Sequence, residues 1–219
     1  MQLLVCAATP KEIQPFLDHH LASRQSRNID ILITGIGLTA TTYRLTRYLS
    51  LKRPDLVIQA GVAGGFSDQL PLGSVVAVRQ ETIADESVVE LRQLRTLFAL
   101  SLVPQNQYPY RRGWLVNPHK EYLKRTGLKA VRGISVNEIT TRPRKIRFYR
   151  ETFDPVVESM EGAALHFTCL MEQVPFLQLR SISNRVGERN KKKWNMQTSI
   201  QHLNQELIQL VETFKENEL

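Results

Sequence analysis

The chain has 219 residues, of which 42% are hydrophobic, and a formal net charge of +8 at pH 7. This length supports one domain with a buried core, and no apolar run approaches the roughly 18 residues of a membrane-spanning helix. The N-terminus has no basic residues before its apolar run, so we expect a strand there and not a secretory signal.

Cysteine usage and charge distribution narrow the class of protein further. The two cysteines, Cys6 and Cys169, show neither disulfide nor zinc spacing, so we expect free buried thiols in a cytoplasmic protein. Most of the positive charge comes from residues 142–150 and 180–193. No nucleic-acid motif accompanies these segments, so we interpret them as solvated loops and helix faces and expect neither nucleic acid nor membrane as a partner.

The first predicted elements are a strand over residues 2–8 and a helix from Pro10 to about His20. Thr9 suits the N-cap position, and proline is favoured at the first helical position. Glu12 then lies in the first helical turn, where the helix dipole stabilises a carboxylate. Because this turn directly follows a strand, Glu12 is also a candidate site residue.

A second strand is predicted over residues 29–33, followed by Gly35-Ile36-Gly37 and a helix to about Leu51. Gly-x-Gly after a strand resembles a dinucleotide-binding fingerprint, which requires an acidic residue at the end of the next strand. Asp55 has the right separation but precedes the strand predicted over residues 56–59. We therefore interpret the glycines as positions where backbone closely approaches a ligand or a neighbouring loop.

Residues 60–66, Ala-Gly-Val-Ala-Gly-Gly-Phe, are predicted to form a tight turn before another strand over residues 72–78. Turns without bulky side chains let a flat ligand lie against the backbone and bond to its peptide groups. Together with the turns after the first two strands, this one indicates a shared site.

The middle of the chain carries the weakest pattern. Within residues 79–130, Asp85-Glu86 is predicted to end a strand, residues 88–102 to be helical and residues 105–113 to form a polar loop. A strand is expected from Gly133 into the following loop, and a basic helix from Arg144.

From Val156 onward the pattern predicts a strand, a helix and a second strand that ends near Asn184. Glu161 then stands at the front of the helix. Ligands of open α/β sheets bind outside the carboxyl ends of the strands, so both polar groups are expected to face one crevice. An amphipathic helix over residues 199–214 follows. Without an internal repeat or linker, residues 1–219 are predicted to form one domain.

The ordered motifs resemble the nucleoside phosphorylase/nucleosidase superfamily over most of the chain, residues 79–130 excepted. They are Glu12, Gly35-Ile36-Gly37, residues 60–65, Glu158-Ser-Met-Glu-Gly-Ala-Ala and Ser181-Ile-Ser-Asn184. The resemblance implies a single-domain, three-layer α/β/α fold around a central mixed, twisted sheet. It also implies an enzyme that cleaves the N-glycosidic bond of a purine nucleoside without metal or cofactor. Relatives are commonly homodimers or larger homo-oligomers.

The resemblance also implies roles for single residues. Cleavage passes through an oxocarbenium-like state, so the enzyme must stabilise a leaving purine, hold the ribose and present water. Glu12 would activate the water, Glu161 would accept bonds from the ribose hydroxyls and Asn184 would bind the base. The further substrate-binding positions it implies are Ile36, Val62, Ala63, Gly64, Val136, Asn137, Ser159 and Met160.

The amide side chain of Asn184 indicates which purine base is bound. Its amide offers NH₂ to a 6-oxo group and C=O to a protonated N7, so hypoxanthine fits better than adenine. Adenosine-type relatives show Glu-Met-Glu where this chain has Ser159-Met160-Glu161, and Glu158 is displaced by one position. A shift of one residue on a strand reverses the facing side, so Glu158 is expected to point elsewhere.

Water is the expected nucleophile, because residues 8–12 and 63–67 lack the arginines with which related phosphorylases hold phosphate. Arg142, Arg144 and Arg185 are candidates to meet a carboxylate on the 5′ substituent. The alternatives are an adenosine-type nucleosidase, a purine nucleoside phosphorylase, and a non-catalytic module that binds nucleosides or nucleic acid.

Overall fold

The computed structural model describes residues 1–22, 28–91 and 93–216. The strands are β1 (Leu3–Ala7), β2 (Ile29–Ile33), β3 (Leu56–Gly65), β4 (Val75–Glu81), β5 (Ser87–Glu90), β6 (Gln93–Thr96), β7 (Tyr110–Arg111), β8 (Trp114–Val116), β9 (Ala130–Ser135), β10 (Val157–Ser159) and β11 (Phe176–Arg185). The helices are α1 (Gln14–Ala22), α2 (Leu38–Leu51), α3 (Lys120–Arg125), α4 (Pro143–Phe153), α5 (Gly162–Met171) and α6 (Met196–Glu216).

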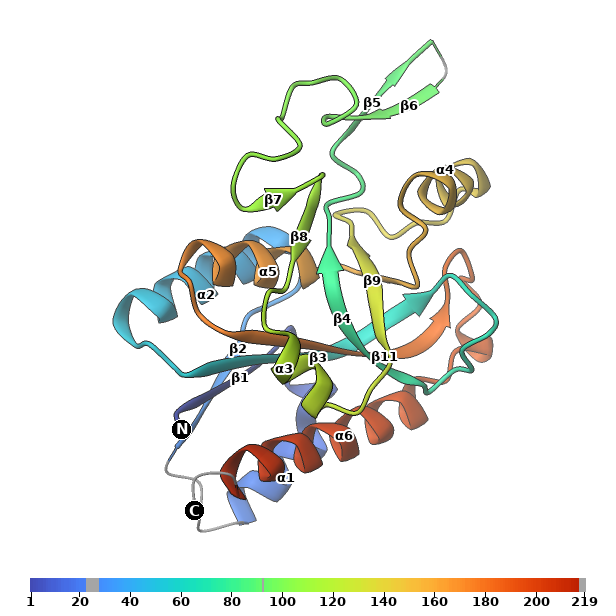
Figure 1. Ribbon diagram of the computed structural model, residues 1–219. Helices are drawn as coiled ribbons and strands as arrows, with labels where there is room; N and C mark the ends of the chain where they lie inside the picture. Colours follow the sequence, from blue (N-terminus) through green and yellow to red (C-terminus); the bar gives the residue numbers. More distant parts are fainter. Residues whose placement is uncertain (23–27, 92, 217–219) are drawn as a thin grey trace.

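A mixed sheet forms the centre of this part of the chain. Its order is β2-β1-β3-β10-β9-β4-β8-β7, and β11 pairs with both β3 and β4. Helices α2 and α5 cover one face, whereas α1 and α6 cover the other (Figure 1). This three-layer α/β/α architecture confirms the predicted fold class.

Strand β1 contributes to the core on both faces of the sheet. Leu3 and Val5 join the apolar cluster beneath α6, whereas Leu4 and Cys6 join the cluster beneath α2 and α5. Side chains alternate along a strand, so a strand covered on both faces has a continuous apolar sequence. Cys6 and Cys169 are free and buried, as expected.

Strand β3 differs from its prediction, because residues 60–65 continue the strand instead of turning. The small residues serve close packing between strands. A Cβ on Gly61 would collide with Nη1 of Arg180, which projects from β11. Gly64 pairs with Glu158 on β10 and with Asn184 on β11. The strand predicted over residues 72–78 is displaced toward the C-terminus, as β4.

The helix predicted over residues 88–102 is wrong. Strands β5 and β6 form a separate antiparallel two-stranded sheet that projects from the body (Figure 1). Val88 and Val89 suit a strand because they are β-branched, and Leu91 takes a positive φ of 48° in the connecting turn. Arg92 lies outside the described residues. The apolar residues of this segment therefore do not form one face of a helix.

The other long elements agree with their predictions. The strand, helix and strand from Val156 onward are β10, α5 and β11, and the terminal amphipathic helix is α6. The predicted first helix begins with a 3₁₀ turn, Pro10–Ile13, before α1. Within the described ranges, none of the helices has the length and apolar character needed to cross a membrane.

Candidate functional site

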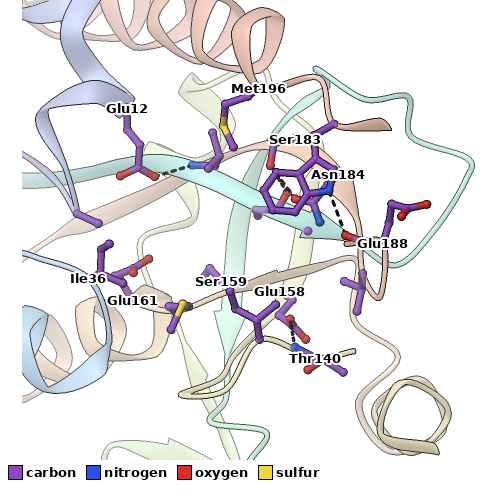
Figure 2. A pocket seen from close by; sticks show the side chains of 18 of the residues that line it. Glu12, Ile36, Thr140, Glu158, Ser159, Glu161, Ser183, Asn184, Glu188 and Met196 are labelled. Carbon is purple, nitrogen blue, oxygen red and sulfur yellow. Dashed lines mark hydrogen bonds between the residues drawn. The ribbon is translucent and has the colours of Figure 1, made fainter. Parts of the chain in front are cut away.

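A cavity of about 420 Å³ lies where the segments after β1 and β2 meet the ends of β3, β10 and β11 and the start of α6. Figure 2 shows Glu12, Ile36 and Glu161 on one side of it and Asn184 on the other, with Ser159 between them. Most of the predicted site residues line it together: Glu12, Ile36, Val62, Ala63, Gly64, Ser159, Met160, Glu161 and Asn184.

Two predicted site residues lie elsewhere. The side chain of Val136 is fully buried in an apolar cluster with Tyr149 and Phe153 of α4. Asn137 hydrogen-bonds Asp85 through its backbone N–H (2.6 Å) and side chain (3.3 Å) and lines a different hollow beside α2. The pocket is instead lined by Ile139 and Thr140, a few residues farther along the same segment.

Glu12 is held by donors from two elements. Its Oε2 accepts from the backbone N–H of Thr9 (3.1 Å) and from the Thr9 hydroxyl (3.2 Å). Its Oε1 accepts from the backbone N–H of Val62 on β3 (3.1 Å). Burial raises the pKa of Glu12, and the positive charge of Arg180 opposes that rise. A fixed carboxylate whose pKa is raised is suited to accept a proton from a nearby water.

Glu161 stands at the N-cap position of α5 and is 5% exposed. Its Oε1 accepts from the backbone N–H of Gly37 at 3.1 Å. Gly37 has a φ of 94°, a conformation that glycine adopts without strain, so the second glycine of the early motif supplies a donor to this carboxylate. The carboxylate of Asp55, by contrast, accepts from the backbone N–H of Gln2 at the opposite ends of the strands. Asp55 therefore lies too far from these glycines to complete a dinucleotide-binding site with them.

Arg180 is a site residue that the sequence interpretation missed, because it was grouped with a solvated basic segment. Its side chain is 1% exposed. Its Nη2 donates to Oε1 of Gln59 (2.8 Å) and lies 3.5 Å from Oε2 of Glu161. The available signal was its place within the apolar strand Phe-Leu-Gln-Leu-Arg, where a charged residue must be paired to be buried.

Asn184 has a fixed amide orientation. Its Nδ2 donates to the carbonyl oxygen of Arg185 (3.0 Å), and its Oδ1 accepts from the hydroxyl of Ser183 (2.9 Å). A flipped amide would set oxygen against the Arg185 carbonyl, so this orientation is favoured. One N–H and one lone pair of the amide are left for a ligand.

Glu158 lines the same pocket, contrary to the expectation that it points elsewhere. Its Oε1 accepts from the backbone N–H of Thr140 at 3.0 Å, so it anchors the loop that lines the pocket beyond β9. Trp194 and Met196, at the start of α6, also line the cavity. They were not among the predicted site residues, and they reach the pocket because the folded chain brings the start of α6 against it.

Glu81, on β4, lies in the core behind Glu161 and is 0% exposed. Its Oε1 accepts from Gln178 (2.9 Å), and its Oε2 is 3.2 Å from the hydroxyl of Ser135. Burial raises the pKa of Glu81 to about 7. A Cβ on Gly162 would collide with this carboxyl, so α5 begins directly against it. In the described ranges, no cluster of three or more metal-ligating side chains accompanies these acids.

We expect Glu81→Gln to flatten the dependence of stability on pH. The pKa of Glu81 is about 7 in the folded state against 4.5 for an ordinary glutamate, so a bound proton stabilises the fold fully below about pH 4.5 and this contribution is lost as pH rises through about 7. The loss amounts to about 3 kcal/mol. Urea denaturation at several pH values measures it. Glu151→Gln, on the exposed face of α4, is the control, and an unchanged slope in Glu81→Gln would contradict the assignment.

The comparisons with known proteins identify relatives of this chain. The family model described as the phosphorylase superfamily matches residues 25–216. A 5′-methylthioadenosine/S-adenosylhomocysteine nucleosidase of Haemophilus ducreyi is 31% identical over 163 residues, which cover 71% of this chain and 67% of that protein. A futalosine hydrolase of Thermus thermophilus is 27% identical over 175 residues, covering 78% of this chain and 76% of that protein.

Solved structures share the fold over nearly the whole chain. A 5′-methylthioadenosine/S-adenosylhomocysteine nucleosidase from Helicobacter pylori superposes with a TM-score of 0.80 at 20% identity, covering 97% of this chain and 99% of that one. The futalosine hydrolase of Helicobacter pylori gives a TM-score of 0.77 at 20% identity, covering 97% and 98%. At these identities the likeness establishes the fold.

Proposed function

This chain belongs to the phosphorylase superfamily, and from that premise we propose that it hydrolyses the N-glycosidic bond of a 5′-modified 6-oxopurine nucleoside. The substrate we propose is futalosine, from which hypoxanthine is released in menaquinone biosynthesis. Relatives that are futalosine hydrolases support this assignment. The observation that carries it is the free hydrogen-bonding capacity of Asn184 in the pocket that also holds Glu12 and Glu161.

The proposed reaction uses the two carboxylates differently. As the C1′–N9 bond breaks, its electron pair leaves with the purine, and the oxygen of a water bonds to C1′. Glu12 takes a proton from that water, while Glu161 accepts hydrogen bonds from ribose hydroxyls. The purine leaves as a neutral base once N7 carries a proton from solvent. The negative carboxylates also stabilise the positive charge that develops on the sugar.

The amide of Asn184 supports a 6-oxopurine as the base. Its free N–H is a donor for O6, and the remaining lone pair of Oδ1 is an acceptor for a protonated N7. Adenine would set its 6-amino group against the Asn184 N–H, which leaves two donors facing each other. Such an unpaired buried donor costs about 1–3 kcal/mol.

A 5′-methylthioadenosine/S-adenosylhomocysteine nucleosidase is the second candidate, favoured by the 31% identity to the Haemophilus ducreyi protein. A phosphorylase is less well supported, because residues 8–12 and 63–67 contain no arginine and the buried Arg180 is already paired with Gln59 and Glu161. A non-catalytic nucleoside-binding module would bind the same ligands without releasing base.

The cations that we propose for the 5′ substituent differ from those expected from sequence. Arg185 donates to the carbonyl oxygens of Ser67 (2.6 Å) and Leu70 (2.9 Å) and pairs with Asp68 (3.0 Å), so its guanidinium is already occupied. Neither it nor Arg142 or Arg144 is among the residues that line the pocket. The cations that do line it are Lys11 and Arg189, and we assign a carboxylate on the ligand to these two.

One assay separates the candidate functions. Pure protein is incubated with futalosine, inosine and 5′-methylthioadenosine, each with and without phosphate, and free base is measured by chromatography. Hypoxanthine released from futalosine without phosphate is the expected result. Adenine release supports the second candidate, strict dependence on phosphate supports a phosphorylase, and bound nucleoside without base release supports the non-catalytic module.

Asn184→Asp is expected to shift the preference from 6-oxopurine to 6-aminopurine nucleosides. An aspartate can accept from the 6-amino group, whereas its oxygen repels O6 of hypoxanthine. We expect the ratio of kcat/KM for futalosine to that for 5′-methylthioadenosine to fall by roughly tenfold or more. Kinetics with both substrates measure the ratio. Asn28→Asp, exposed directly before β2 and at the opposite ends of the strands from the pocket, is the control. An unchanged ratio in Asn184→Asp would refute the role of Asn184.

The organisation of residues 1–219 as one domain and their assembly into a homo-oligomer are part of this proposal. A single cooperative unfolding transition is the expected result for one domain. Size-exclusion chromatography with light scattering measures the mass of the assembly. The mass of a monomer would refute the expected homo-oligomer.

A further inference from the structure

Two serine hydroxyls connect buried Glu81 to the pocket. Oε2 of Glu81 lies 3.2 Å from Oγ of Ser135. Oγ of Ser135 in turn lies 3.5 Å from Oγ of Ser159. Ser159 lines the pocket, whereas Glu81 and Ser135 are fully buried. Glu81 therefore stands at the inner end of a hydrogen-bonded chain whose outer end lines the pocket.

The first turn of α5 occupies one acceptor site on each serine. Ser135 accepts from the backbone N–H of Ala163 (2.8 Å), and Ser159 accepts from the backbone N–H of Gly162 (3.2 Å). A hydroxyl has one proton to donate and two lone pairs. Each serine therefore keeps one proton to donate and one lone pair to accept with. For the chain to stay hydrogen-bonded, both hydroxyls must donate toward the same end of it, either toward Glu81 or toward the pocket.

The proton on Glu81 selects that direction. When Glu81 is protonated, it donates to Ser135, Ser135 donates to Ser159, and the proton of Ser159 points into the pocket. When Glu81 is ionised, Ser135 donates to it, Ser159 donates to Ser135, and a lone pair of Ser159 faces the pocket. We propose that Glu81 is a positioning residue that decides, through Ser135 and Ser159, whether the pocket offers its ligand a donor or an acceptor.

The surroundings of Glu81 support this role. Burial is the largest cause that raises the pKa of Glu81 to about 7, the hydrogen bond from Gln178 and the charge of Arg180 oppose this rise, and the charge of Glu161 adds to it. Gln178 of β11 donates to Oε1 in both states, which leaves Oε2 to carry the proton. His166 of α5 donates from Nδ1 to the carbonyl oxygen of Leu115, and burial lowers the pKa of His166 to about 4, so it stays neutral.

Glu81→Gln tests the proposal because it fixes one direction. Its amide oxygen can still accept from Gln178, and its NH₂ then donates to Ser135 as the protonated acid does. With futalosine as substrate, which rests on the proposed function, we expect the KM of the natural protein to change by roughly threefold to tenfold between pH 6 and 8. The KM of Glu81→Gln is expected to stay near the low-pH value of the natural protein throughout.

Ser159→Ala provides the matched background. Without the outer hydroxyl, adding Glu81→Gln is expected to leave KM unchanged at every pH, because the two positions then no longer communicate. Ser135→Ala interrupts the chain while it keeps the acid, and it should also remove the pH dependence of KM. An effect of Glu81→Gln that persists in the Ser159→Ala background, or a natural pH profile in Glu81→Gln, would overturn the proposal.

An infrared titration tests the proton on Glu81 without any substrate. The carbonyl band of a protonated carboxyl is expected in the natural protein and should disappear as pH rises through about 7, whereas Glu81→Gln should lack it. Absence of this band from the natural protein would overturn the proposal. If the natural protein releases no base from any nucleoside, the proposed function fails, and Kd for inosine replaces KM in the same set of variants.

Discussion

Glu12→Gln is expected to slow base release by roughly 10²–10⁴-fold, because it removes the group that takes the proton of the attacking water. Pre-steady-state measurement of hypoxanthine release from futalosine gives the rate, and KM should change much less than kcat. The amide also replaces an oxygen that accepts two hydrogen bonds from Thr9. The free energy of unfolding should therefore fall by about 1 kcal/mol.

A matched control separates this effect from a general effect of lost charge. Glu151→Gln makes the same chemical change on the exposed face of α4 and should keep the natural rate. The natural enzyme should also gain activity as pH rises through the pKa of Glu12, which burial raises, because the ionised form is the base. A Glu12→Gln protein that retains more than about a tenth of the natural rate is incompatible with a general base at this position.

Arg180→Met is expected to cost about 3–5 kcal/mol of folding stability, because it leaves the buried Glu161 carboxylate without its cation. The same change should raise the pKa of Glu12 further, since the charge of Arg180 lowers it. The acidic limb of the kcat profile should then move to higher pH. Denaturant unfolding and a pH series of kcat measure the two effects.

Arg142→Met is the control for this substitution, because Arg142 is exposed at the start of α4. It should change the free energy of unfolding by less than about 0.5 kcal/mol. If Arg180→Met is as stable as the control, the pairing of Arg180 with Glu161 contributes little. If its acidic limb does not move, Arg180 does not act on Glu12.

The parts of the fold that sequence predicted are those fixed by local patterns. Thr9 and Pro10 mark the start of the first helical segment, and the apolar runs mark β1, β2 and the start of β3. The strand, helix and strand around Glu161 follow the same rule, because their apolar periodicities differ clearly. The position of Glu12 and Asn184 at one pocket follows from the carboxyl ends of parallel strands meeting at one edge.

The features that sequence did not predict depend on distant partners. An arginine is usually solvated, and the burial of Arg180 becomes clear only when the fold places Gln59 and Glu161 against its guanidinium. Glu81 gives no signal of its own, since its role depends on Gln178 and on Ser135 of another strand. Residues 88–102 contain apolar residues compatible with a helix, but local strand pairing decided their structure.

The contact between Gly61 and Arg180 restricts how this protein can evolve. Any side chain at position 61 would occupy the space of the Arg180 guanidinium, so a single substitution there displaces the cation beside Glu161. Loss of Arg180 alone leaves the buried carboxylate of Glu161 without its cation. Descendants of this sequence are therefore expected to keep both residues or to exchange both together, and a survey of paired changes at the two positions would reveal that joint inheritance.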